Sequence, residues 1–252
     1  MEGGGGIERL ADDLLSLIAS HLSLEEAARA CVLSSRWDKL WNAIPCLSFV
    51  SPRYPDDIND CSKYVQKVKR VLERRGGALP PAAAFTLNSL EFGHLLDRTH
   101  WQLVEDWFCY AMAHKVENLI LDLWIDDPVE ALETPPAAAL TNLKWLKTLK
   151  LKRVNLTKEF VELVLSNCRL LEKLVVVPNE QLPGLRISGS SLLLRHLKIG
   201  GYSFDEFELI SLCAPNLTSF NYFGPRLILG TLDVPGCSAC PSAAELKLCT
   251  DL

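Results

Sequence analysis

The residues that could do chemistry in this chain are its nine cysteines and five histidines. Cys237 and Cys240 form the only C-x-x-C, a spacing typical of redox motifs and of half a zinc site. A structural zinc site needs four ligands, and no histidine lies between Cys213 and the C-terminus. A redox motif begins a helix, whereas Pro235 and Pro241 predict a loop around this pair. We therefore expect no metal site and no thiol enzyme here.

Other catalytic patterns are also missing from the sequence. The histidines, at positions 21, 94, 100, 114 and 196, have no metal-ligand spacing. There is no phosphate-binding G-x-x-x-x-G-K and no G-x-S-x-G nucleophile turn. No cysteine has an activating neighbour, so a cysteine-dependent enzyme is the weakest alternative. Cys168 and Cys213 follow helical patterns closely and are expected to fill small buried slots. The sequence predicts a binding protein without catalytic residues, metal or cofactor.

Composition limits the class of protein further. The chain has 252 residues, 48% apolar and 23% charged, which is typical of a globular protein of one large or two modest domains. The net charge is −5, which disfavours a general nucleic-acid binder. We expect the Gly-rich start, residues 1–6, to be disordered. It has neither a basic region nor an apolar run, so we expect no secretory signal. No apolar run suggests a membrane span, and nine reduced thiols fit the cytoplasm, the nucleus or both.

Leucine supplies about 18% of the residues, and it is periodic. The pattern L-x-x-L-x-L, allowing other apolar residues, recurs at spacings of 29, 30, 25, 23, 23 and 26 residues. The seven copies start at Leu87, Val116, Leu146, Leu171, Leu194, Leu217 and Ala243. These spacings approach the period of leucine-rich repeats, about 20–29 residues.

Each copy predicts a short strand whose leucines face a shared core, because side chains alternate along a strand. Helix signals stand between several strands. Thr157 can cap one helix, Asp205 with Glu208 can begin another, and Thr99 with Gln102 a third. Strand, turn and helix in repetition predict an α/β solenoid over residues 84–252.

The first fifty residues lack this repeat and predict three short helices. The first runs from about Asp13 to His21, and the second begins at a Ser23–Glu26 capping box. The third follows Ser35 and ends at Pro45. Apolar residues cover about 200° of the first helix, twice what a surface helix needs. One apolar stripe can pack within this small unit, and the surplus predicts a partner, either the solenoid or a second protein.

Residues 7–50 resemble an F-box, of the type that plant F-box/leucine-rich-repeat proteins carry. The family pattern has Leu-Pro before the first helix, then Leu-Leu and Ile, Val-Leu-Ser-x-Arg-Trp-x-x-Leu-Trp, and Pro-x-Leu-x-Phe. The matching positions are Ile7, Leu10, Asp12, Asp13, Leu14, Leu15, Ile18, Leu22, Ala27, Val32, Leu33, Ser34, Arg36, Trp37, Leu40, Trp41, Pro45, Leu47 and Phe49. One departure is Ala11, which stands where the family has proline, and it predicts weaker adaptor binding because the entry to the helix loses a rigid φ. The expected fold is α+β, a three-helix F-box followed by the repeat solenoid.

The resemblance implies a substrate receptor of an SCF-type ubiquitin ligase. The F-box would dock on a Skp-type adaptor, which joins it to a cullin–RING scaffold, and the repeats would bind a protein substrate. The residues expected at the adaptor are Leu10, Ala11, Leu14, Ile18, Leu22, Val32, Leu33, Trp37, Leu40 and Trp41. The alternative for these residues is intramolecular core, which for Ile18 and Leu22 is equally supported.

The alternative for the protein is a repeat scaffold that does not engage the ligase. The related family commonly continues into further repeats and an FBD region, so a shortened form is one interpretation of this chain.

The segment between the two units, residues 51–83, is expected to hold a loop and then a helix from about Cys61 to Arg75. Its many lysines and arginines favour a solvated face over a phosphate-binding or nuclear-import role. The solenoid's concave face should present the outward strand positions, among them Val175 and Val177. Those expected to bind substrate are Asp122, Lys150, Lys152, Lys173, His196, Lys198, Asn221 and Phe223. The basic centre of this set suggests an acidic substrate segment, and no pocket signature supports a small hormone.

Overall fold

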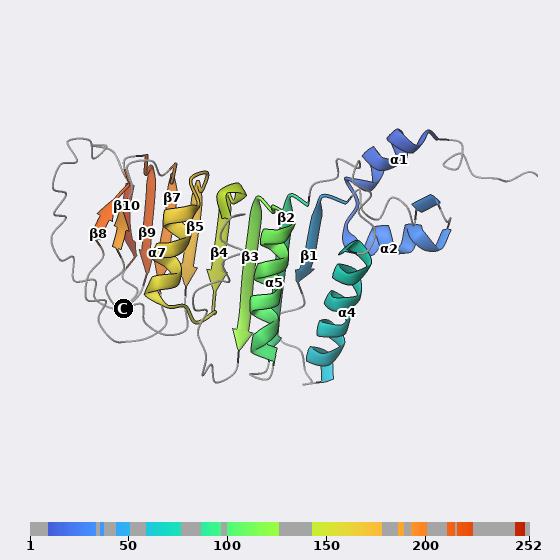
Figure 1. Cartoon of the computed structure of the whole chain (residues 1–252), viewed down its shortest axis with the longest axis horizontal. Helices are drawn as coiled ribbons and strands as arrows, with labels where there is room; N and C mark the ends of the chain where they lie inside the picture. Colours follow the sequence, from blue (N-terminus) through green and yellow to red (C-terminus); the bar gives the residue numbers. More distant parts are fainter. Residues whose placement is uncertain are drawn as a thin grey trace, which may run out of the picture.

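A single parallel β-sheet organises the molecule (Figure 1). The computed structural model describes residues 10–33, 36–37, 44–50, 59–76, 87–96, 100–125, 143–177, 186–188, 193–200, 211–214, 216–223 and 245–249. The eight strands follow one another across the sheet in chain order, and every neighbouring pair is parallel. They are β1 (Cys46–Val50), β2 (Ser89–Leu96), β3 (Asn118–Ile125), β4 (Thr148–Lys152), β5 (Lys173–Val177), β7 (His196–Gly200), β9 (Ser219–Phe223) and β10 (Glu245–Cys249).

Seven of these strands confirm the predicted repeats. Each begins two residues after the start of its leucine pattern, as β4 does after Leu146 and β5 after Leu171. Two apolar rows cross the sheet in register, one through Leu149 and Leu174 and one through Leu151 and Val176. The members of both rows from β2 to β9 are buried. A repeat cannot bury its own apolar face, so stacking the units is what makes this core.

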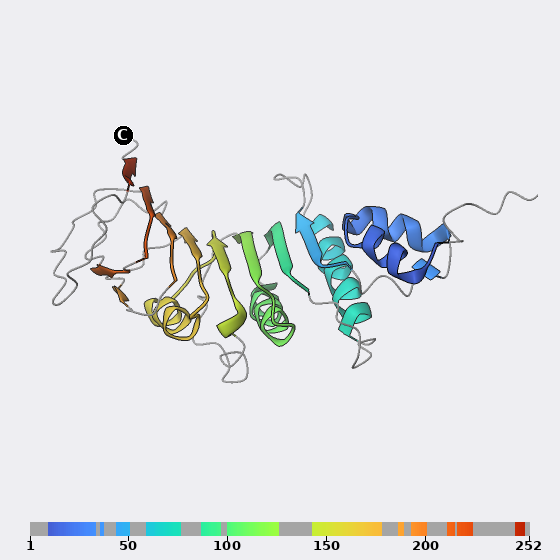
Figure 2. The same cartoon turned by 90° about the horizontal axis from the view of Figure 1, so that it is seen from above.

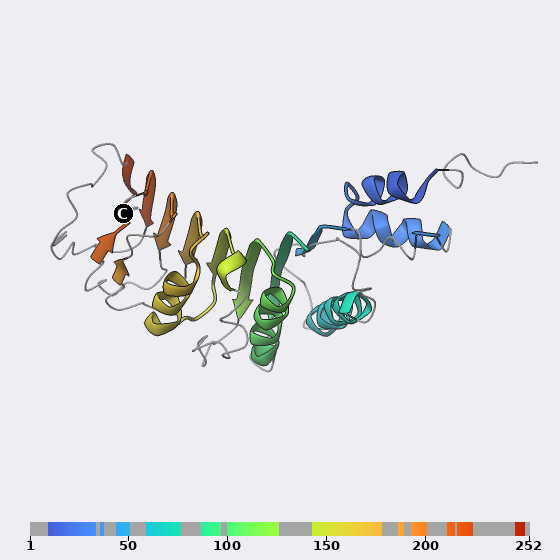
Figure 3. The same cartoon turned by 45° about the horizontal axis from the view of Figure 1, so that its top comes forward.

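Helices cover one face of the sheet (Figures 2 and 3). They are α4 (Asn59–Gly76), α5 (Trp101–Ala113) and α7 (Lys158–Asn167), with a 3₁₀ turn, η4 (Leu143–Trp145), before β4. A two-stranded sheet, β6 (Arg186–Ser188) with β8 (Ser211–Cys213), lies on the same side, and β6 contacts α7. The sheet curves so that its other face, which these helices do not cover, is concave (Figure 2). None of the helices within the described ranges is long and apolar enough to cross a membrane.

The helix signals have mixed outcomes. The Thr157 cap is confirmed, because the Phe160 amide donates to its Oγ1 at 3.1 Å. For α5 the N-cap position is His100, whose side chain makes no capping hydrogen bond, and Gln102 donates to Glu105. Thr99, the predicted cap, and the helix expected after Asp205 lie outside the described residues.

Two N-terminal helices, α1 (Asp12–Ala19) and α2 (Leu24–Leu33), precede the sheet. The predicted capping box opens α2, since Ser23 donates to the Glu26 carboxylate from both its amide and its hydroxyl, and the Glu26 amide donates back. Of the predicted third helix, positions 36–37 are helical and 38–43 lie outside the described residues. The three-helix arrangement is therefore not established, while the repeat half of the predicted fold is confirmed.

Strand β1 and helix α4 extend the solenoid toward the N-terminus beyond the expected boundary at residue 84. The β1 residues Leu47 and Phe49 are buried beside β2. Four α4 residues, Cys61, Tyr64, Val68 and Leu72, are buried in the same core. The expected linker helix is thus the first helix of the covered face, and β1 is a strand that the sequence analysis did not predict.

Hydrogen bonds tie α4 to the chain around β1. The Tyr64 hydroxyl donates to the Phe49 carbonyl at 2.8 Å, and the buried Arg75 guanidinium donates to the Ile44 carbonyl at 2.7 Å. Burial raises the pKa of Tyr64 and lowers that of Arg75. Leu24 and Ala27 of α2 belong to the same buried cluster as Tyr64, so α2 and the solenoid share buried surface.

Candidate protein-binding surfaces

Helix α1 has two apolar stripes, as its 200° apolar arc predicts. Leu15 and Ala19 are buried in a small cluster with Trp37. The opposite stripe remains at the surface, with Leu14 50% exposed and Leu17 57% exposed. We call this opposite stripe, with Ile18 at 38%, the outer stripe of α1. Three large apolar side chains side by side on one short helix suit a partner surface.

The entry to α1 is held by Arg36. Its guanidinium donates to the Leu10 carbonyl at 2.8 Å and pairs with the Asp12 carboxylate. Ala11 is at the N-cap in an extended conformation and offers no capping side chain. The first turn carries Asp12 and Asp13, whose charges suit a helix N-terminus. Arg36 thus fixes an entry that has no proline and no cap.

The residues expected at the adaptor fall into three groups. Leu14, Ile18 and Val32 are exposed large apolar residues, with Val32 at 86%, and Ala11 is exposed as well. Leu10 and Leu22 are half-buried against the cluster of Trp37, which is itself a core residue in this chain. The side chains of Leu33, Leu40 and Trp41 lie outside the described ones.

Leu17 is the outer-stripe residue that the expected adaptor set omitted. On the helical wheel it lies 60° from Leu14, on the side away from Leu15, so its exposure could have been predicted from spacing alone.

The concave face brings most of the expected substrate residues together. Six of the eight line one shallow depression of about 410 Å³ across β4 to β9, which we call the concave groove. They are Lys150, Lys152, Lys173, His196, Lys198 and Asn221. In register, Lys150 lies opposite Val175, which lies opposite Lys198. Parallel strands are about 4.8 Å apart, so the two ammonium groups stand on either side of one apolar position.

Val175 and Val177 were expected to be outward and accessible, but both are buried. Val175 keeps its predicted place on the concave face, where it lies between Lys150 of β4 and Lys198 of β7. Long lysine side chains can lay their methylene stems over neighbouring apolar groups, a physical reason for such low exposure. The floor of the groove is therefore apolar and its walls are cationic.

Asp122 is engaged within the chain. Its carboxylate pairs with Lys152 at 3.1 Å and with the guanidinium of Arg153. Arg153 has a φ of 57°, so a left-handed turn at the end of β4 aims it back at β3. Lys152 is thereby partly neutralised, whereas Lys150 and Lys173 form no ion pair within the described part of the chain. The side chain of Phe223 lies outside the described ones.

Burial disfavours the thiolate form of three described cysteines. Cys168 is fully buried at the end of α7, as expected, and burial raises its pKa to about 12. Burial also raises the pKa of Cys31 and of Cys109. Among the residues that the structure describes, no cluster of histidine, cysteine and carboxylate could hold a metal ion. Cys237 and Cys240 lie outside those residues.

Known proteins resemble this chain over most of its length. A family model described as "At1g61320/AtMIF1, LRR domain" matches residues 129–240. The F-box/LRR-repeat protein At3g03360 of Arabidopsis thaliana is 29% identical over 77% of this chain and 42% of its own length. The Arabidopsis F-box protein At5g03100 is 26% identical over 90% of this chain and 74% of its own length.

A third relative, the putative F-box/FBD/LRR-repeat protein At5g44950 of Arabidopsis thaliana, is 30% identical over 87% of this chain. The chain spans 53% of that relative and 42% of the first. A match over 90% of the chain necessarily includes part of the first fifty residues. The family model covers the repeats that hold β4, β5, β7 and β9. Over most of its length, the chain is therefore similar to plant proteins that are named as F-box and F-box/leucine-rich-repeat proteins.

Proposed function

We propose that this protein is a substrate receptor of an SCF-type ubiquitin ligase. The outer stripe of α1 docks on a Skp-type adaptor, and through it the receptor joins a cullin–RING scaffold. The observation that carries the proposal is Leu14, Leu17 and Ile18 side by side at the surface of α1. Relatives named as F-box proteins give the stripe its expected partner. The receptor supplies no catalytic residue, and ubiquitin transfer is done by the other subunits.

The concave groove is the proposed substrate site. Lys150, Lys173 and Lys198 surround an apolar floor, so the groove suits a protein segment rich in aspartate and glutamate. His196 and Asn221 add polar groups to its lining. A charged segment in such a groove gains specificity from the arrangement of charge more than from raw affinity.

The adaptor half is tested by co-purification of the full chain with a Skp-type adaptor. The variant Leu14→Asp with Leu17→Asp puts two charges into the stripe without touching buried residues. The matched control is Leu170→Asp with Leu193→Asp, because those leucines are also exposed but lie in the repeats. We expect the stripe variant to lose the adaptor and the control to retain it.

Equal retention by both variants would contradict docking through α1. Absence of binding by the wild-type chain would instead favour the alternative, a repeat scaffold that does not engage the ligase. Ala11 and the uncapped start of α1 are the features that such a result would implicate.

The substrate half is tested by reversing the groove's charge. The triple variant Lys150→Glu, Lys173→Glu and Lys198→Glu is compared with Lys69→Glu, Lys144→Glu and Lys158→Glu, which changes the net charge equally outside the groove. Proteins captured on each chain are quantified by mass spectrometry. We expect the groove variant alone to lose captured proteins that carry acidic segments, and an unchanged set would refute the assignment.

A further inference from the structure

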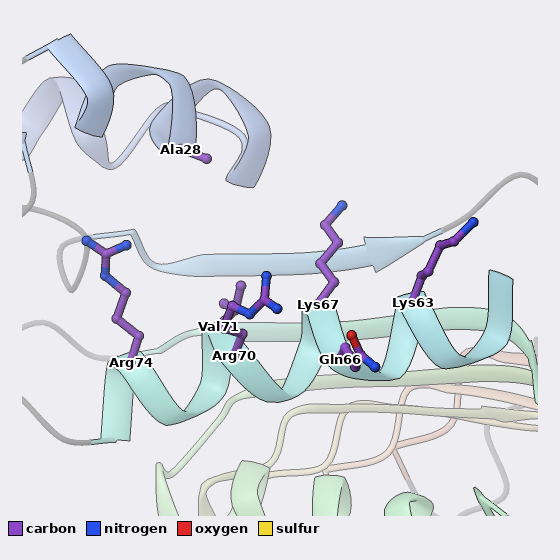
Figure 4. A pocket seen from close by; sticks show the side chains of 7 residues that line it. All are labelled: Ala28, Lys63, Gln66, Lys67, Arg70, Val71 and Arg74. Atoms are coloured by element: carbon purple, nitrogen blue, oxygen red, sulfur yellow. The ribbon is translucent and has the colours of Figure 1, made fainter. Parts of the chain in front are cut away.

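A second basic groove lies between α2 and α4, away from the concave face. Its volume is about 390 Å³, and it is lined by Ala28 of α2 and, on α4, by Lys63, Gln66, Lys67, Arg70, Val71 and Arg74. In Figure 4, Lys63, Lys67 and Arg74 rise from the side of α4 that faces α2. We call this depression the α2–α4 groove. It uses neither the outer stripe of α1 nor the strands of the concave groove.

The cations of this groove form one row along the helix. Lys63, Lys67, Arg70 and Arg74 follow one another at intervals of four, three and four residues, which places them on a single face. The row spans about 16 Å at 1.5 Å per residue, the length of about five residues of extended chain. Helix α4 holds six basic and two acidic residues, although the whole chain has a net charge of −5. Positive charge is thus concentrated on this helix.

The groove also has an apolar floor. Val71 is half-buried and Ala28 faces it from α2, so an aliphatic side chain can be accommodated between the cations. Lys67 has an ion pair with Glu25, whose carboxylate is 3.8 Å from the Lys67 ammonium. Both side chains are more than half exposed, and exposed pairs of this kind contribute little, so a bound carboxylate can replace Glu25.

We infer that the α2–α4 groove binds an acidic peptide segment of a partner protein, about five residues long and carrying an aliphatic side chain at its centre. Carboxylates of the segment pair with Lys67 and Arg70, and the aliphatic group covers Val71. The apolar floor favours a peptide over a nucleic-acid backbone or a free phosphate, which offer no such side chain. This site is independent of the proposed ligase function, since the chain alone can be assayed for it.

The probe is the fluorescein-labelled peptide Asp-Glu-Leu-Glu-Asp, titrated with the full chain at low salt and followed by anisotropy. The test variant is Lys67→Glu with Arg70→Glu, and the matched control is Lys69→Glu with Lys158→Glu, which lie outside the groove. We expect the test variant to bind about tenfold more weakly or worse, because like charges then meet in the groove, and the control to change less than about twofold. A peptide with serine in place of leucine should bind about threefold more weakly, since it leaves Val71 uncovered.

Carbodiimide coupling then locates the peptide, because it joins a carboxylate to the nearest lysine amine. We expect coupling at Lys63 and Lys67, and coupling confined to Lys150, Lys173 and Lys198 would overturn the assignment. Equal weakening by the test and control variants would also overturn it, as would equal binding of the serine peptide. If a ten-residue oligothymidine binds more tightly than the peptide and is lost in the test variant, the groove is a nucleic-acid site instead.

Discussion

Replacing Trp107 by alanine should uncouple the N-terminal part of the protein from the repeats. The Trp107 ring on α5 stacks on Phe92 of β2, with centroids 4.4 Å apart and an interplanar angle of 2°. Phe92 in turn stacks on Phe49 of β1 at 5.5 Å, and Tyr64 of α4 meets Trp107 edge-on at 6.2 Å. Four consecutive elements of the solenoid therefore meet in one aromatic cluster.

The expected loss of stability follows from burial and from these ring contacts. Trp107 is buried, and truncating a buried tryptophan to alanine costs about 3–5 kcal/mol. Within that figure, each ring contact contributes about 0.5–1.5 kcal/mol beyond area burial. Because repeat proteins are stabilised by neighbour-to-neighbour interfaces, the loss is local to the units around β1 and β2.

Hydrogen exchange followed by mass spectrometry measures this. In Trp107→Ala we expect residues 44–50 and 59–76 to lose protection while residues 148–177 keep it. Phe160→Ala is the matched control, since Phe160 is buried on α7 and meets Phe108 edge-on at 5.4 Å, so it should reverse the pattern. Uniform loss of protection in both variants, or a cost below about 1 kcal/mol for Trp107→Ala, would refute the idea that the cluster joins these units.

Three further predictions concern single positions. Leu15→Ala should lower the free energy of unfolding by about 2–5 kcal/mol, whereas Leu14→Ala, on the exposed stripe, should change it by less than about 0.5 kcal/mol; similar values in urea titrations would contradict the two-stripe description. Thr157→Ala should cost about 1 kcal/mol through loss of the α7 cap, and Thr157→Ser should restore it. Cys168 should be alkylated far more slowly than the exposed Cys46 at pH 8, because its pKa of about 12 keeps it a thiol until the pH nears that value; equal rates by mass spectrometry would count against the buried slot.

The repeat strands could be predicted from sequence because each one buries alternate residues against its neighbours. The leucine pattern therefore located β2 through β10 in the large sheet. Strand β1 has the same alternation at Leu47 and Phe49, but 43 residues separate its start from that of β2, outside the period used. Its residues were also assigned to the F-box pattern. A single short strand gives no indication of the sheet that it joins, so β1 was not predicted.

The surfaces were harder to predict than the core. Register placed the concave lysines correctly, since every second residue of a strand shares a face. Exposure was not predictable from register, because Val175 lies on the concave face between Lys150 and Lys198 and is nevertheless buried. The burial of Trp37 could not be predicted either, because Trp37 packs against Leu15, a residue of a different helix. The α2–α4 groove needed the structure for the same reason.

On the proposed function, the sheet also determines where a substrate is held. The strands are hydrogen-bonded without interruption from β1 to β10, and β5, at the centre of the concave groove, is four strands from β1. At about 4.8 Å per strand, that separation is about 19 Å. Helix α2 is attached to the same body, since Leu24 and Ala27 share the core of Tyr64 and Val68. An adaptor bound to α1 would therefore be held at a fixed distance from the groove. Ubiquitin transfer would then favour substrate lysines that lie at a particular distance from the bound acidic segment.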